Sequence, residues 1–248
     1  TIQYIGVHDD TDWFDTMNLK LSSLTPRADR MRMHRLGLSI VALSQGVPFF
    51  HAGDEILRSK SGDRNSYNSG DWFNRIDWTL ASNNWGVGLP PANGNQNDWD
   101  ILAPALADPN LKPTSRDIQD TFRHMLEMLV IRKSSHLFRL RTAEAIKQSV
   151  SFYNTGPDQV PGLIVERIQN RNRFCFPAQQ AVVLVNATPQ SQTFADATFQ
   201  RQKLVLHPVQ AFSQDPVVRT SKFESSTGTF TIPARTAAVF IEPCFGSQ

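Results

Sequence analysis

Two short apolar runs, each followed by a polar cluster, organise the first part of the chain. They cover residues 2–7 and 47–50 and predict strands, the second of them buried on both faces. Between them, a Thr-Pro pair at 25–26 is typical of a helix start, and apolar residues recur at helical spacing up to Gly46. Residues 1–55 are therefore predicted to form a βαβ unit with parallel strands. Ligands bind at the carboxyl ends of such strands, where both polar clusters would lie.

Residues 56–114 form one long segment rich in Asn, Asp, Gly, Pro and Trp. A loop of this length within a compact domain is usually functional. Its four tryptophans either stack on sugar faces or anchor the loop to the protein. A helix is predicted from Ser115, and His124 on it is interpreted as a surface or packing residue. The apolar face of this helix is predicted to consist of Ile118, Phe122, Met125, Leu126 and Leu129.

The pattern changes after residue 137 to short β-rich runs separated by Gly, Pro, Asn and Asp turns. No helix-length pattern intervenes, so a separate antiparallel β-sandwich is predicted. The predicted fold class is thus α/β followed by all-β. The predicted strands cover residues 150–153, 163–168, 181–185, 203–206, 229–232 and 237–241.

Composition and charge exclude two kinds of partner. A net charge of +2 over 248 residues is too small to indicate nucleic acid or an anionic membrane. The longest apolar stretch, residues 36–43, is too short to span a bilayer, and no signal-peptide pattern is present. Cys175 and Cys244 allow one bridge, which does not indicate a compartment, and Asn186 opens a formal glycosylation sequon. Because Thr1 starts directly in strand-like sequence without an initiator Met, we expect the chain to be a piece of a longer protein.

The polar cluster after the first predicted strand carries the main candidate chemistry. Three aspartates, at positions 9, 10 and 12, follow His8. Carboxylates this close repel one another unless they are solvated, hydrogen-bonded or functional. A solvated turn or a helix N-terminus accommodates them as well as an active site does, so both interpretations stay open.

Several other chemistries are not indicated by the sequence. No Cys or His pair has metal-ligand spacing, so no metal site is predicted. The aspartates loosely suggest calcium, but their loop lacks the glycine and the distal glutamate of an EF-hand. No glycine-rich phosphate loop and no Gly-x-Ser-x-Gly elbow follow the strands. Carboxylates beside a histidine and aromatic residues at strand ends remain, which is typical of glycoside hydrolases.

Longer motifs then point to a family. The sequence QGVPFFHAGDEILRSK at 45–60 and DRNSYNSGDWFN at 63–74 resemble the pullulanase and limit-dextrinase branch of the α-amylase superfamily. The His-Asp pair at 8–9 resembles the strand-7 segment of that superfamily. The similarity continues through NNWGVGLPP at 83–91 and IPARTAAVF at 232–240, so it runs nearly end to end.

This resemblance implies a fold and an assembly. Residues 1–136 would be the C-terminal part of a (β/α)8 barrel, containing strands 7 and 8 and helices 7 and 8. Residues 137–248 would be the antiparallel β-sandwich that follows the barrel in the family. The partners implied are a branched α-glucan substrate and the missing N-terminal barrel strands of the same enzyme.

The resemblance also implies a reaction, the retaining hydrolysis of α-1,6-glucosidic branch linkages in pullulan, limit dextrins and starch-derived glucans. Asp9 would be the transition-state stabiliser of the catalytic trio. The nucleophile and the general acid belong to strands 4 and 5 of the family, and no segment of this chain matches them, so the fragment alone is expected to be inactive. The residues implied to bind substrate are His8, Arg64, Asn65 and Tyr67, with Asn97 as a further candidate.

Some positions depart from the family or lie outside its hydrolytic set. The family usually has Asn where this chain has Asp10, which brings an extra negative charge next to Asp9 unless a cation or an arginine compensates. His51, Asp54 and Glu55 are assigned to holding the strand-8 loop. No cofactor is required, and calcium, the preferred glucan and the compartment (plastid, periplasm or medium) are left open. The alternative function is a non-catalytic fragment that binds glucan or has a structural role.

Overall fold

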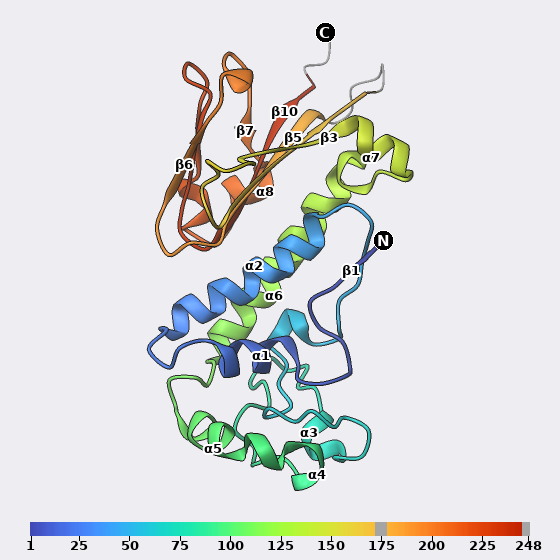
Figure 1. The fold of residues 1–248 in the computed structure, drawn as a ribbon, viewed down its shortest axis with the longest axis vertical. Helices are drawn as coiled ribbons and strands as arrows, with labels where there is room; N and C mark the ends of the chain where they lie inside the picture. The colour runs from blue at the N-terminus through green and yellow to red at the C-terminus, as the bar shows by residue number, and fades with distance from the viewer. Residues whose placement is uncertain (172–177, 245–248) are drawn as a thin grey trace. The chain divides into compact units, whose positions relative to one another are not determined.

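The computed structural model describes residues 1–171 and 178–244, so Cys175 lies outside the described residues. The chain divides into two compact units (Figure 1). The N-terminal unit comprises residues 2–41 and 48–125, and the C-terminal unit comprises Thr1, 42–47 and 126–248. The elements from the start of the chain are β1 (Ile2–Gln3), α1 (Trp13–Lys20), α2 (Arg27–Leu43), β2 (Val47–Pro48), η1 (Asp54–Ile56), α3 (Asp71–Asn74), α4 (Ala92–Asn95), η2 (Gln96–Asp98), α5 (Trp99–Ala107), α6 (Ser115–Ser134) and η3 (His136–Arg139).

The two predicted strands at the start of the chain are present but short. Val47 N–H donates to Thr1 O at 3.0 Å, and Phe49 N–H donates to Gln3 O at 2.8 Å. From the first bond to the second, the donor residue and the acceptor residue both move two positions toward the C-terminus. This is the hydrogen-bond pattern of parallel strands. The loops that follow β1 and β2 therefore leave from the same edge of this two-stranded sheet.

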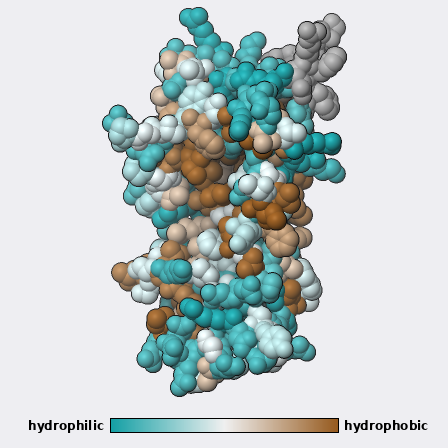
Figure 2. Space-filling model, turned by 45° about the vertical axis from the view of Figure 1, so that its right-hand side comes forward, coloured by the Kyte–Doolittle hydropathy of each residue, from teal (hydrophilic) through white to brown (hydrophobic). Residues whose placement is uncertain are grey.

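The prediction that the second strand is buried on both faces is wrong. The Phe49 side chain is 55 % exposed, and on the neighbouring segment Tyr4 is 58 % exposed. The reason is that β1 and β2 pair only with each other in the described part of the chain, so no further strand covers their apolar side chains. Figure 2 shows apolar side chains reaching the surface in several places among polar ones.

Helices α2 and α6 confirm the two predicted helices. The sequence pattern did not predict the shorter helices α1, α3, α4, α5, α7 (Ala143–Ser149) and α8 (Pro208–Ala211). The cluster at 9–12 precedes α1, and Asp12 occupies the N-cap position, but its side chain makes no capping hydrogen bond. On α6 the predicted face is partly wrong, because Leu126 and Leu129 are exposed while Ile118 and Met125 are buried. His124 packs against α2, where its Nε2 lies 2.8 Å from Ser39 Oγ.

The C-terminal unit contains two antiparallel sheets, with strand orders β3-β4-β5-β10-β7 and β6-β9-β8. Their shared hydrophobic core joins residues of both sheets, including Val165 of β4, Phe230 of β9 and Phe240 of β10. In Figure 1 the sheets lie face to face around this core. The elements of this part are α7 (Ala143–Ser149), β3 (Val150–Tyr153), β4 (Leu163–Gln169), β5 (Ala178–Asn186), β6 (Gln192–Ala195), η4 (Ala197–Phe199), β7 (Val205–Leu206), α8 (Pro208–Ala211), η5 (Val218–Thr220), β8 (Lys222–Glu224), β9 (Thr229–Ile232) and β10 (Thr236–Pro243).

All six predicted strands of this region are present, and the bounds predicted for β3 and β9 match the structure. The strands β6 and β8 were not predicted, because they are short edge strands whose side chains are mostly polar. The sequon residue Asn186 is fully buried, and its Nδ2 donates to Gln190 O at 2.8 Å and Pro233 O at 2.9 Å. Its side chain therefore has a structural role in the folded protein.

A buried carboxyl group in β4 makes the stability of this unit depend on pH. Burial raises the pKa of Glu166 from 4.5 to about 7, so between these values the folded state holds a proton that the unfolded state releases. Stability therefore falls as pH rises through this interval. We expect Glu166→Gln to be more stable than the parent above this interval by about 3 kcal/mol. Below pH 4.5 the two should unfold alike.

Urea denaturation on both sides of the interval measures this difference. Glu144→Gln, on the exposed face of α7, is the matched control and should unfold like the parent at every pH. An equal gain for Glu166→Gln at low and high pH would contradict the assignment, because it would show that the carboxyl charge is not the cause.

Candidate functional site

The side chains of His8 and Asp9 stand in solvent after β1. They are 82 % and 83 % exposed, and His8 Nε2 lies 3.4 Å from Asp9 Oδ1. The backbone turns sharply at the next residue, since Asp10 has a φ of 61°, a left-handed conformation that Asp and Asn tolerate better than most residues. The turn leaves both side chains available to a ligand.

Residues of the loop after β2 donate hydrogen bonds to the backbone of the His8–Asp10 segment. Ser66 Oγ donates to His8 O at 2.9 Å, and Lys60 Nζ donates to Asp10 O at 2.5 Å. Lys60 Nζ also contacts Ser66 Oγ. Segments that are 50 or more residues apart in the sequence thus form one site, as the predicted βαβ unit requires.

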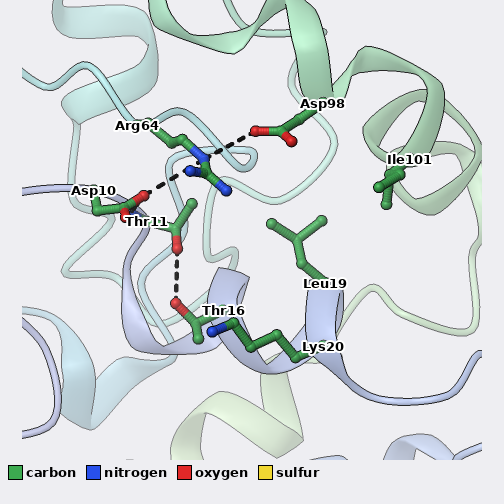
Figure 3. A pocket seen from close by; sticks show the side chains of 8 residues that line it. All are labelled: Asp10, Thr11, Thr16, Leu19, Lys20, Arg64, Asp98 and Ile101. Atoms are coloured by element: carbon green, nitrogen blue, oxygen red, sulfur yellow. Dashed lines mark hydrogen bonds and ion pairs between the residues drawn. The ribbon is translucent and has the colours of Figure 1, made fainter.

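Arg64 lies between two carboxylates beside this segment, as Figure 3 shows. Its Nε is 3.5 Å from Asp10 Oδ1 and 2.9 Å from Asp98 Oδ2. The arginine therefore supplies the positive charge that compensates Asp10. These three residues line an open pocket of about 360 Å³, whose remaining walls are Thr11, Thr16, Leu19, Lys20 and Ile101.

The pocket combines two kinds of wall. The hydroxyl oxygens of Thr11 and Thr16 lie 2.7 Å apart and join the charged groups as hydrogen-bonding partners. Leu19 of α1 and Ile101 of α5 line another part with apolar side chains. Such a mixture suits a polyhydroxylated ring, which has hydroxyl groups at its rim and apolar C–H faces.

The structure places the other predicted binding residues on the same loop or close to Asp98. The amide of Asn65 donates to Asn68 Oδ1 at 2.6 Å, which orients its side chain along the loop. The Tyr67 ring is 96 % exposed and free to stack on a ligand. Asn97 is exposed and precedes Asp98 in η2, but it is not among the residues that line the pocket. These placements leave the three roles as predictions.

Two contributors to the site were not predicted from the sequence. One is Asp98, the closest ion-pair partner of Arg64. The other is Asn95, which is buried; its Oδ1 accepts from Arg64 N–H at 2.8 Å, and its Nδ2 donates to Asp63 Oδ1 at 2.7 Å. The density of Asn and Asp around the predicted Asn97 is the one signal that pointed to this region.

The carboxylates that lie close together in the sequence have different environments. Asp12 is fully buried, with Oδ1 3.3 Å from His51 Nδ1 and Oδ2 3.5 Å from Arg58 Nε. Asp15 is also fully buried, and burial together with the charge of Asp12 raises its pKa to about 7. Asp9 and Asp10 are therefore the members of this group that a ligand can reach, and Asp9 is the one beside the His8 side chain.

The loop residues assigned to a structural role have structural contacts. Asp54 is buried and its Oδ2 accepts from His51 N–H at 3.2 Å, and burial raises its pKa to about 7. Glu55 Oε2 accepts from Gly53 N–H at 2.9 Å. Within residues 1–171 and 178–244, no group of three His, Cys, Asp or Glu side chains could hold a metal ion. No helix in the same ranges is long and apolar enough to cross a membrane.

The open pocket combines two carboxylates, a guanidinium, hydroxyls and apolar side chains, beside the loops that follow two parallel strands. Such a lining is typical of proteins that bind carbohydrates. Residues 80–243 match the family described as alpha-1,6-glucosidases, pullulanase-type, C-terminal. The chain belongs to this family.

Individual relatives agree with this membership. The chain is 48 % identical to "Pullulanase 1, chloroplastic" of Arabidopsis thaliana, over 98 % of this chain and 26 % of that protein. It is 32 % identical to "Pullulanase" of Klebsiella pneumoniae, over 98 % of this chain and 22 % of that protein. The chain thus spans about a quarter of the length of these curated relatives.

Solved structures show the same correspondence. The fold matches the crystal structure of PulA from Klebsiella oxytoca with a TM-score of 0.91 and 31 % identity, covering 100 % of this chain and 24 % of that one. It matches the maltotriose complex of PulA from Klebsiella pneumoniae with a TM-score of 0.90 and 33 % identity, covering 100 % of this chain and 27 % of that one.

Proposed function

We propose that this chain forms part of a retaining glycoside hydrolase that cleaves α-1,6-glucosidic branch linkages in pullulan, limit dextrins and starch-derived glucans. The observation that carries the proposal is the geometry of His8 and Asp9. Their side chains are exposed at the end of a parallel strand, while their backbone is held by the loop after the neighbouring strand. Membership of the pullulanase-type family supports the choice of linkage.

In this proposal residues 1–136 are the C-terminal part of a (β/α)8 barrel, with strands 7 and 8, and residues 137–248 are a β-sandwich. The parallel pairing of β1 with β2 supports the first assignment, and the core shared by two antiparallel sheets supports the second. The exposed side chains of Ile2, Tyr4 and Phe49 would be covered by further barrel strands, which are the proposed partner.

The proposed chemistry assigns Asp9 to the transition state. Its carboxylate would accept hydrogen bonds from sugar hydroxyls, and these bonds would strengthen as the ring flattens and gains positive charge. His8 would bind the same sugar, and Arg64, Asn65, Tyr67 and Asn97 would contact neighbouring ones. The nucleophile and the general acid would come from other strands of the barrel. A bound maltotriose in a related PulA structure supports a glucan as the ligand.

The proposal is tested with the intact protein that contains this sequence. We expect it to release reducing ends from pullulan, whose α-1,6 linkages are accessible, and not from linear amylose. NMR of the first product should show the α-anomer, since two displacements retain the configuration. Cleavage of amylose alone, or a β-anomeric first product, would contradict the proposal. Glucan binding without cleavage would instead favour the non-catalytic alternative.

A further inference from the structure

Lys60 is fully buried, which is unusual for lysine because its ammonium group loses its hydration. Ammonium groups inside proteins are normally paired with a carboxylate. None of the ion pairs among residues 1–171 and 178–244 includes Lys60. Its Nζ instead donates to two neutral acceptors, Asp10 O and Ser66 Oγ. Burying an ammonium group without a carboxylate partner costs folding free energy, so we look for a role of Lys60 other than stabilising the fold.

The two acceptors are on either side of Asp9. Asp10 O is the carbonyl that follows it, and Ser66 Oγ donates in turn to His8 O, the carbonyl that precedes it. One ammonium group is therefore linked, directly or through Ser66, to the carbonyl oxygens of the two residues next to Asp9 in the sequence. Hydrogen bonds from a charged donor are shorter and stronger than neutral ones, which suits this purpose.

The backbone of Lys60 is held by a hydrogen bond to the buried carboxylate of Asp15. Asp15 Oδ2 accepts from Lys60 N–H and from Gly62 N–H, both at 2.9 Å. Asp15 is in α1, which follows the His8–Asp10 turn directly. The lysine is thus attached through its backbone to the helix after the turn and through its side chain to the turn.

We propose that Lys60 is a positioning residue for Asp9, an inference that rests on the proposed function. Because it is fully buried, its ammonium group does not reach the sugar, and its effect on the reaction passes through the backbone of Asp9. Only a long, flexible side chain that ends in several donors can reach both acceptors from its position. Methionine has a comparable length but no donor, so Lys60→Met isolates the hydrogen bonds.

The test compares Lys60→Met with Lys112→Met, an exposed lysine, in the intact protein. A misplacement of a catalytic group by an ångström lowers turnover by about 100-fold, so we expect kcat on pullulan to fall by about 10- to 100-fold. KM should change less than kcat, because His8 is the one proposed substrate-binding residue whose backbone carbonyl belongs to this network. Hydrogen–deuterium exchange of residues 8–11 should become faster in Lys60→Met and not in Lys112→Met.

Ser66→Ala provides a second variant in case Lys60→Met does not fold. It removes the link to His8 O but keeps the bond from Lys60 to Asp10 O, so its effects should have the same direction and a smaller size. The double variant should be no slower than Lys60→Met, because both substitutions interrupt one network.

The exchange measurement separates this inference from the proposed function. Unchanged exchange at 8–11 in the folded variants overturns the positioning role, whatever the activity. Faster exchange with unchanged kcat also overturns it, because the position of Asp9 would then not matter. If Asp9→Asn keeps full activity, the proposed function fails and the catalytic part of this inference fails with it. Faster exchange with a selective fall in kcat supports the inference.

Discussion

An Asp9→Asn variant of the intact protein is expected to lose turnover on pullulan by about 10³-fold or more, because hydrogen bonds that strengthen in the transition state contribute several kcal/mol. The amide keeps the size of the carboxylate but lacks its charge and one of its acceptors. The effect on KM should be smaller, since the lost interaction is made mainly in the transition state. Steady-state kinetics on pullulan measure both parameters.

The neighbouring Asp10→Asn variant is the matched control. Its side chain pairs with Arg64, which keeps Asp98 as a closer partner at 2.9 Å. Asn also tolerates the φ of 61° at this position. We expect activity to be retained or improved. An active Asp9→Asn variant would remove the assignment of Asp9, whereas total loss in Asp10→Asn would mean that Asp10 has its own role in the reaction.

The second large effect is expected for stability, at Arg58. Its guanidinium lies 3.5 Å from the fully buried carboxylate of Asp12 and donates to Asn74 O at 3.0 Å. Arg58→Met would leave His51 as the only ion-pair partner of Asp12 within the described ranges, 1–171 and 178–244. Removing one member of a buried pair typically destabilises a protein by about 3–5 kcal/mol, because the other charge stays buried without compensation.

Chemical denaturation measures this loss. Arg116→Met is the control, because Arg116 is 89 % exposed in its pair with Asp120 and exposed pairs contribute little. The double variant that also replaces Asp12 by Asn should recover much of the stability lost in Arg58→Met, since no charge is then left buried. A small effect of Arg58→Met, or no recovery in the double variant, would show that the pair is not a major source of stability.

The secondary structure was predictable where the signal is local. The helix start at 25–26 and the apolar periodicity after it predicted α2, and alternating β-rich runs between turns predicted β3 and β9 with their observed bounds. The prediction failed for short helices such as α1 and α5, which are eight and nine residues long and therefore show few turns of apolar periodicity. Packing against the rest of the N-terminal unit stabilises them, as the burial of Phe14 in α1 and Leu102 in α5 indicates.

The sequence by itself determined that carboxylates and a histidine follow one strand, and that a polar loop follows the next, because residue order and apolar runs are local properties. Only the tertiary structure decided which of those groups are exposed. Asp9 is in solvent, whereas Asp12, three residues later, is buried. That difference depends on His51 and Arg58, which the fold brings to Asp12 from the loop after β2. A carboxylate can be buried only where such distant partners offset its loss of hydration, and no local pattern in the sequence records them.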